Sequence, residues 1–386
     1  MRLTLRTRRL TMTTIKFIGL DVHKDTIAVA VADEGLKGEV RFYGTIPNTP
    51  EAIRRLVNRL SGPGTAPSFC YEAGPCGYGI YRQLTKLGAA CLVIAPSMMP
   101  RRPGERIKTD RRDALTLARL LRAGELTAVW VPDEGHEAVR DLVRARRQAK
   151  DDLTAAKLTL LSFLLRQDRR FPGRSTWSQA HWRWLGQQAF ASPHHQLVFG
   201  ECIRRIEEAQ ARCERLDLAL AEAVAGWSLA PLVEALQALR GVGLVVAATL
   251  VAEIGDLSRF ESPKQLMSWL GLVPSERSSS TRRRQGGITK SGNAHARTML
   301  IEAGWSYRLP AREAVRYRAR VDGLPDEIRA VAWRAQVRLC QRFRRLMAAG
   351  KPLPKVTTAI ARELAGFVWD IARRVQVAPA PRTQGA

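Results

Sequence analysis

Short apolar segments alternate with amphipathic ones through the first third of the chain. Runs rich in β-forming residues predict five strands, at residues 17–21, 26–33, 39–46, 68–73 and 90–95. Residues 51–60 and 81–87, between the later runs, have the apolar spacing of helices. Three consecutive strands followed by alternating helices and strands predict an α/β domain over residues 15–130, and this order suits a ribonuclease-H-like fold.

A helical region is predicted next, over residues 131–228. Apolar residues keep an unbroken four-three spacing from Cys202 to Ala223, which is the pattern of a coiled-coil seam, and a similar stripe runs from Leu142 to Phe163. Two such helices could pack as an antiparallel hairpin within one chain or dimerise with a second subunit. The stripes are equally typical of helices that face their own core.

An insertion rich in tryptophan, residues 167–200, interrupts this helical region. Trp177, Trp182 and Trp184 stand there among arginine, glutamine and histidine. Aromatic rings among cations can stack on nucleic-acid bases, whereas tryptophans in a loop more often anchor the loop to the helices beneath it. The sequence leaves both interpretations open.

The remaining residues, 229–375, predict a second, helical domain. Within it two apolar helical segments flank Gly241 and Gly243 in the manner of a helix-hairpin-helix element, which can present backbone N–H groups to a phosphate. The same glycine spacing also makes an ordinary turn between helices. The basic first residues, 1–14, predict a disordered arm, or an upstream start with Met12 as the natural one, and the last residues, 376–386, predict a disordered tail.

The charge of the chain narrows the classes of partner. Its 386 residues contain 62 Lys and Arg against 36 Asp and Glu, and the net charge of +26 suits a polyanion held by many phosphate contacts. A solvated basic surface is the alternative. No apolar run approaches the roughly 20 residues that span a bilayer, and the basic start lacks the apolar core of a secretory signal. We therefore expect a cytoplasmic protein that does not enter a membrane.

Four acidic residues carry the strongest chemical signal, and they are Asp21, Glu72, Asp110 and Asp113. The first two end predicted strands and the other two lie three residues apart on a predicted helix, so the fold can gather them around divalent metal. Carboxylate oxygens bind hard cations, and two Mg²⁺ ions about 3.5–4 Å apart can activate an attacking oxygen and stabilise a leaving one. This pattern indicates phosphodiester chemistry. The alternative for the helical pair is structural, with Asp110 capping the first turn.

Histidine and cysteine do not predict a further metal site. The six cysteines lack the paired short spacing of zinc ribbons and predict reduced thiols, at Cys70, Cys76, Cys91, Cys202, Cys213 and Cys340. His23 and His136 have no partner histidine or cysteine at ligand spacing. We expect His23 to lie in a turn beside the carboxylates and His136 to lie at the surface.

A second unusual segment combines serine, arginine and glycine in a predicted polar loop. Ser278, Ser279 and Ser280 come first, followed by Arg282, Arg283 and Arg284 and then by Gly286, Gly287 and Lys290. Arginines can hold a phosphate while a serine hydroxyl attacks it. The same composition is also typical of a disordered linker.

Six motifs occur in a specific order along the chain: GLDVHKDT, YEAGPCGYG, KTDRRDA, RGVGLVVAATLVAEIGD, GLVPSERSSS and GGITKSGN. In this order they resemble the DEDD-motif insertion-sequence transposases with a catalytic serine, also described as bridge-RNA-guided recombinases. The resemblance implies a RuvC-like N-terminal domain whose four acids, named above, bind Mg²⁺, two ions at each active site. It also implies a C-terminal transposase domain whose serine attacks DNA and becomes linked to it.

The resemblance further implies which serine reacts and which partners are needed. In the family pattern the serine follows GLxP by a short spacer and precedes a glycine, which selects Ser279. Ser280 occupies the glycine position here, so Ser278 and Ser280 stay alternatives. A homo-oligomer, either a dimer or a tetramer, would bring the metal site and the serine together from different subunits. A structured noncoding RNA would pair with donor and target DNA. The protein would be bacterial and associated with the nucleoid. The residues expected around the phosphate are Arg282, Arg283, Arg284 and Lys290.

Three other functions compete with this one. In a metal-dependent, junction-resolvase-like nuclease, water attacks the phosphodiester and the serine loop only binds DNA. An actin-like sugar kinase also has an aspartate after its first strand, but the turn there usually needs glycine, and Val22 and His23 follow Asp21 here. In a non-enzymatic nucleic-acid binder the acids would be structural.

Overall fold

The computed structural model describes residues 14–35, 37–96, 99, 109–279, 282–313 and 315–375, and of residues 278, 279, 282, 283, 316 and 317 it describes the backbone alone. The chain divides into two compact units, with the boundary between Val131 and Pro132. The predicted disordered arm and tail lie outside the described residues, except that Thr14 begins the first strand.

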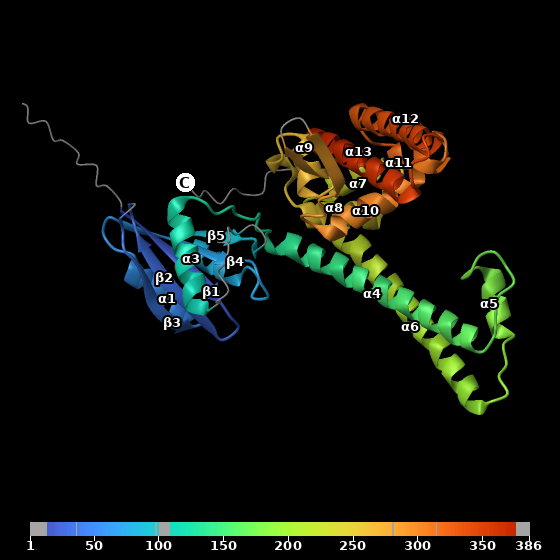
Figure 1. The fold of residues 1–386 in the computed structure, drawn as a ribbon, viewed down its shortest axis with the longest axis horizontal. Helices are drawn as coiled ribbons and strands as arrows, with labels where there is room; N and C mark the ends of the chain where they lie inside the picture. Colours follow the sequence, from blue (N-terminus) through green and yellow to red (C-terminus); the bar gives the residue numbers. More distant parts are fainter. Residues whose placement is uncertain are drawn as a thin grey trace, which may run out of the picture. The chain divides into compact units, whose positions relative to one another are not determined.

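A mixed five-stranded sheet forms the centre of the first unit (Figure 1). Its strands are β1 (Thr14–Val22), β2 (Thr26–Asp33), β3 (Val40–Pro47), β4 (Thr65–Glu72) and β5 (Ala90–Ile94). In the order β3-β2-β1-β4-β5, the first three strands pair antiparallel, and β4 and β5 continue parallel to β1. The helices α1 (Pro50–Leu60) and α2 (Gly79–Lys86) lie in the connections to β4 and β5. The five predicted strands are thereby confirmed.

Helices cover both faces of this sheet, and β2 shows which helix covers which face. Side chains alternate along a strand, and Ile27, Val29 and Val31 of β2 pack into the core that α1 and α2 share. The alanines between them, at positions 28, 30 and 32, pack against α3 (Asp110–Ala123) on the opposite face. Small side chains on that face let α3 lie close to the sheet.

The second unit begins with a long antiparallel helical hairpin. Its helices are α4 (Glu134–Arg166) and α6 (Pro193–Ala225), which lie side by side in Figure 1. Ion pairs join Arg146 to Asp217 and Arg212 to Asp152, so the two helices run in opposite directions. Of the arrangements that the stripes left open, the structure has the hairpin within one chain, and the predicted seam of α6 faces α4.

The tryptophan-rich insertion carries one short helix, α5 (Gln179–Gly186), at the end of this hairpin. Trp177 and Trp184 pack against the apolar core between α4 and α6, and both rings contact the fully buried ring of His181. The side chain of Trp182 is 36% exposed. Anchoring to the helices beneath therefore accounts for two of the three tryptophans.

Helices surround one apolar core in the rest of the second unit. They are α7 (Ala230–Leu236), α8 (Leu244–Ile254), α9 (Pro263–Trp269), α10 (Ala294–Gly304), α11 (Val315–Val321), α12 (Asp326–Ala348) and α13 (Leu353–Arg374), with short 3₁₀ turns at Leu257–Arg259 and Trp305–Arg308. Between α9 and α10 the chain forms a two-stranded antiparallel hairpin, β6 (Pro274–Ser279) and β7 (Arg282–Ile288). The predicted polar loop is therefore wrong for the described backbone, which pairs as two antiparallel strands with one register shift between Pro274 and Glu276.

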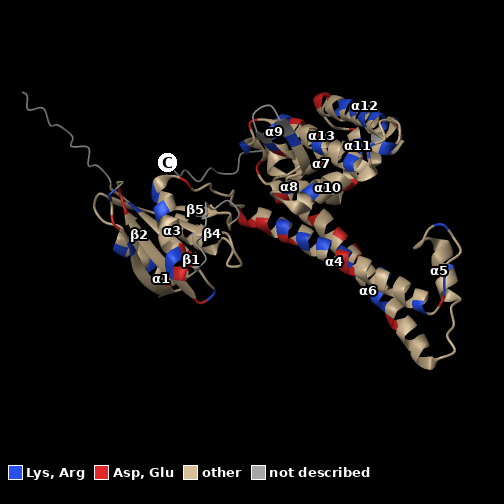
Figure 2. Ribbon diagram, viewed as in Figure 1, with Lys and Arg blue, Asp and Glu red and all other residues tan. Residues whose placement is uncertain are grey.

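Exposed basic residues occur along α12 in the second unit. Figure 2 shows Lys and Arg along α12, where the side chains of Arg334 and Arg338 are 62% and 68% exposed.

Among the described helices, none is by itself long and apolar enough to cross a membrane, and α6 with α7 meets that test only as a pair bent by 117°. All six cysteines are free thiols, as predicted.

Candidate functional site

Two of the predicted acids lie at the same edge of the sheet in the first unit. Asp21 lies near the end of β1 and Glu72 is the last residue of β4, and these strands are parallel neighbours in which Leu20 pairs with Tyr71. Continuing this register by one residue sets Asp21 opposite Glu72. The carboxyl ends of neighbouring parallel strands meet at one edge, so the sheet itself accounts for this pair.

The helix α3 brings the other two acids to Asp21. A Cβ atom at Gly19 of β1 would collide with the backbone of Ala114 and Ala118, so α3 lies directly on the strand at the one position without a side chain. Asp110 and Asp113 occupy the first turn of that helix. The alternative in which Asp110 caps the helix is wrong, because Thr109 is the N-cap and its hydroxyl accepts from the Arg112 N–H.

His23 completes the cluster. As predicted, it lies in the turn between β1 and β2, and there its N–H donates to the Thr26 carbonyl. Its Nε2 atom is 3.3 Å from Asp21 Oδ2 and 3.5 Å from Asp110 Oδ1. One atom each of Asp21, His23 and Asp110 lies within 4.8 Å of the other two, which is a separation that a single metal ion can bridge.

The electrostatics of Asp21 suit a bound cation. Burial raises the pKa of the Asp21 carboxyl above its ordinary 3.8, and the negative charges of Asp113 and Asp110 raise it further, while His23 opposes the change. A divalent cation would relieve both the repulsion and the desolvation. The donors that surround the site are mainly carboxylate oxygens, which is the ligand type of Mg²⁺ and Ca²⁺. The residues therefore fit the predicted metal, with His23 as a further candidate ligand.

The predicted serine segment lies in the second unit, on the two-stranded hairpin of β6 and β7, which we call the serine hairpin. Ser278 pairs with Arg283 and Ser279 with Arg282 across the two strands, while Ser280 lies outside the described residues. Arg284 is exposed on β7, and Lys290 follows the hairpin with a left-handed backbone, φ 57°. The backbone register thus sets arginines directly across from serines.

The two glycines of the predicted phosphate-binding turn have different surroundings. Gly241 has φ 81°, and a Cβ atom there would lie 2.6 Å from the Ala303 carbonyl oxygen and 2.7 Å from Ser306 Oγ. Packing between helices therefore requires this glycine. Gly243 is the N-cap of α8, and a Cβ atom there would meet open space. Of the pair, Gly243 is the one that stands at a helix N-terminus, where backbone N–H groups can meet a phosphate.

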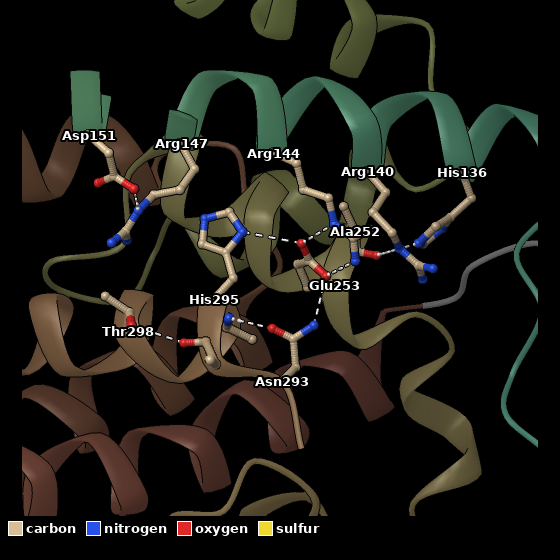
Figure 3. A network of polar contacts seen from close by, with 12 residues as sticks. His136, Arg140, Arg144, Arg147, Asp151, Ala252, Glu253, Asn293, His295 and Thr298 are labelled. Atoms are coloured by element: carbon tan, nitrogen blue, oxygen red, sulfur yellow. Dashed lines mark hydrogen bonds and ion pairs between the residues drawn. The ribbon is translucent and has the colours of Figure 1, made fainter. Parts of the chain in front are cut away.

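A polar network around Glu253 of α8 escaped the sequence prediction (Figure 3). Arg144 of α4, Asn293 and His295 all bond to its carboxylate. Next to it, His136 contradicts the predicted surface position, because it is 1% exposed and its Nε2 donates to the Ala252 carbonyl at 2.8 Å. One sequence signal was present, since Glu253 is the one charged residue of the apolar segment LVVAATLVAEI.

Comparison with known proteins agrees with this arrangement. Residues 18–167, which include the carboxylate cluster, match a DEDD-type family described as Transposase, and residues 233–318, which include the serine hairpin, match the Transposase IS116/IS110/IS902 family. A Sinorhizobium fredii protein named as a transposase, y4qE, is 48% identical over 93% of this chain and 89% of its own length. The transposase for insertion sequence element IS1533 from Leptospira borgpetersenii is 31% identical over 88% of this chain and 99% of its own. The transposase for insertion sequence element IS1111A from Coxiella burnetii is 26% identical over 76% of this chain and 78% of its own.

The fold, the carboxylate cluster and these relatives define an insertion-sequence transposase, an enzyme whose substrate is DNA. The chain belongs to the IS110 family of these transposases, which the two matched segments together identify.

Proposed function

We propose that this transposase cuts and rejoins DNA through a covalent serine–DNA intermediate, that its carboxylate cluster holds Mg²⁺, and that a noncoding RNA selects donor and target DNA. The observation that supports the proposal most directly is the convergence of Asp21, Asp110 and Asp113 from a strand and a helix that a glycine brings into contact. The alternative in which these acids are purely structural does not explain why like charges gather around a half-buried carboxyl.

The metal would be held by Asp21, Glu72, Asp110 and Asp113, with His23 beside them. Bound there, Mg²⁺ would supply positive charge to a phosphate whose own charge grows in the transition state. Two ions at each site are proposed on the family resemblance. Asp21 contributes its carboxylate in the ionised form, which its raised pKa makes costly in the absence of a cation.

The serine would act as nucleophile toward DNA, with Ser279 selected by the family pattern and Ser278 and Ser280 as alternatives. A bond forms between the serine Oγ and phosphorus while the bond from phosphorus to one strand oxygen breaks. The hydroxyl loses its proton and the departing oxygen gains one. The hydroxyl at the end of a new strand then attacks the same phosphorus and releases the serine, so the phosphodiester energy is conserved. Arg282, Arg283, Arg284 and Lys290 would neutralise the phosphate.

An assembly of several subunits and an RNA belongs to the same proposal. The acids and the serine lie in different units of the chain, and the family resemblance supports an active site to which one subunit gives the acids and another the serine. The net charge of +26 accommodates both DNA and a structured RNA. A dimer and a tetramer both satisfy this arrangement.

The test is to incubate purified protein with its element's flanking RNA, DNA ends and Mg²⁺ and to look on denaturing gels for DNA attached to protein. We expect an adduct in the wild type that is lost in Ser279→Ala and in Asp21→Asn. Ser258→Ala, which changes an exposed serine outside the hairpin, is the matched control and should retain the adduct.

The outcomes separate this reaction from hydrolysis. If the adduct persists in Ser279→Ala but disappears in Ser278→Ala or Ser280→Ala, the nucleophile is the neighbouring serine. Free cut ends without an adduct, surviving all three serine substitutions but not Asp21→Asn, would make the enzyme a metal-dependent nuclease in which water attacks.

A further inference from the structure

Glu253 is a buried carboxylate with every acceptor position occupied. Its side chain is 1% exposed on α8. Arg144 donates from Nε to Oε1 and from Nη2 to Oε2, both at 2.9 Å. Asn293 Nδ2 donates to Oε2 at 2.7 Å, and His295 Nδ1 lies 3.2 Å from Oε1 (Figure 3). Each oxygen thus receives two hydrogen bonds, which is the capacity of an ionised carboxylate.

These donors keep Glu253 ionised, and the ionised carboxylate shows which nitrogen of His295 acts as the donor. Burial alone would raise the pKa of the Glu253 carboxyl, but the hydrogen bonds from His295, Arg144 and Asn293, together with the charge of Arg144, hold it well below its ordinary value. An ionised carboxylate can only accept, so His295 donates to it from a protonated Nδ1. The network is therefore a set of donors that converges on one negative charge.

Three separate parts of the second unit meet at this charge. Arg144 belongs to the long helix α4 and Glu253 to α8. Asn293 is the N-cap of α10, since its Oδ1 accepts from the Ala296 N–H at 2.9 Å while its Nδ2 donates to Glu253. We define these three residues together with His295 as the Glu253 clamp.

The clamp is continuous with the base of the serine hairpin. Directly before Asn293, the Thr289 N–H donates to the Val273 carbonyl at 2.9 Å and the Lys290 N–H to the Gly271 carbonyl at 3.1 Å. Arg297 Nη1 closes the same base by donating to the carbonyls of Leu270 and Ser291, both at 2.8 Å. These hydrogen bonds hold the two ends of the serine hairpin together. Asn293, which follows this base in the chain, bonds to Glu253.

We propose that Glu253 is a positioning residue for the serine hairpin and that, through Arg144, it fixes the direction of the hairpin relative to α4. The inference rests on the proposed role of the hairpin serine. With six residues in β6, and about 3.3 Å for each, the tip stands about 20 Å from the base. A tilt of about 5° at the base moves such a tip by about 1.7 Å, which is enough to misplace an attacking oxygen.

The experiment uses Asn293→Ser in the full-length protein. Serine is as good an N-cap as asparagine, so the variant keeps α10 but loses the amide that reaches Glu253. Gln210→Ser is the matched control, because Gln210 donates its amide to an exposed carboxylate, Glu214, on α6. Hydrogen–deuterium exchange of residues 274–288 reports on the hairpin, and the rate of adduct formation at saturating DNA reports on positioning.

In Asn293→Ser we expect hairpin amides to exchange about tenfold faster and adduct formation to slow by about tenfold or more, because a hydrogen bond to a buried charge is lost. Exchange in α12 and α13 and the affinity for DNA should match the control. Unchanged hairpin exchange and adduct rate would overturn the inference, as would uniformly faster exchange over the whole unit. Faster hairpin exchange in a protein whose wild type forms no adduct would refute the serine reaction and leave the clamp standing.

Discussion

The contact at Gly19 offers a direct test of how the carboxylate cluster is assembled. A Cβ atom on this residue of β1 would lie 2.5 Å from the Ala118 nitrogen and closer still to the Ala114 carbonyl oxygen. Because ordinary contact begins at 3.4 Å, Gly19→Ala forces α3 away by at least about 0.9 Å. Because the obstacle is helix backbone, no rotamer change can relieve it. Overpacking of this kind costs about 1–3 kcal/mol of unfolding free energy.

The same displacement moves Asp110 and Asp113 away from Asp21. Changes behind a metal site that misplace its ligands typically lower metal affinity by about 10–100-fold, and we expect that loss in Gly19→Ala. Calorimetric titration with Mg²⁺ measures the affinity, and denaturant unfolding measures the stability. Gly79→Ala is the control, because a Cβ atom at Gly79 meets open space. Wild-type metal affinity in a folded Gly19→Ala protein would refute the idea that contact with α3 builds the site.

Three further predictions concern ionisation and packing. Since the pKa of Asp21 is raised in the folded state, its contribution to stability is greatest below pH 3.8 and is lost as the pH rises through the folded pKa. Asp21→Asn should therefore unfold at a higher temperature than the wild type at neutral pH without Mg²⁺, and adding Mg²⁺ should raise its unfolding temperature no further. Burial lowers the pKa of His136, so the stability that this residue contributes is complete above pH 6.5 and is lost as the pH falls through the folded pKa. The unfolding temperature should therefore depend less on pH across that range in His136→Gln. An unchanged pH dependence would contradict the burial argument. Leu160→Ala, at a fully buried position of the α4–α6 hairpin, should lower the free energy of unfolding in denaturant by about 2–5 kcal/mol. Leu158→Ala, at a residue that is 59% exposed, should lower it by under about 0.5 kcal/mol. Equal losses of unfolding free energy would mean that the apolar seam between α4 and α6 does not stabilise the unit.

The strands and most helices could be predicted because their signals are local. In β2 isoleucine and two valines, which favour strands, alternate with alanines between the polar residues Thr26 and Asp33, so the strand can be predicted from its local sequence. Asp21 and Glu72 could be placed at strand ends for the same reason. The apolar period of α6 was equally clear, but a period only shows that a helix face is covered. It does not say whether the cover is the same chain or another subunit.

The serine hairpin is the element that the sequence least predicted. Serine, arginine and glycine have weak β preference, so the composition indicated a loop. The pairing of β6 with β7 depends on a base whose left-handed glycines, Gly271 and Gly292, pack against backbone of the opposite segment. These contacts join residues about twenty positions apart, which a local pattern does not contain.

The sequence by itself determined which residues make up the two proposed sites, a set of carboxylates near strand ends and at a helix start and a serine beside arginines, because both depend on residue type and local order. Only the tertiary structure decided which groups meet. It brought Asp110 to Asp21 through a glycine contact, replaced Asp110 by Thr109 as the helix cap, and buried His136. It also joined Arg144, Asn293 and His295 at Glu253. Such meetings depend on the distances that packing sets between residues far apart in the chain, and no local pattern encodes those distances.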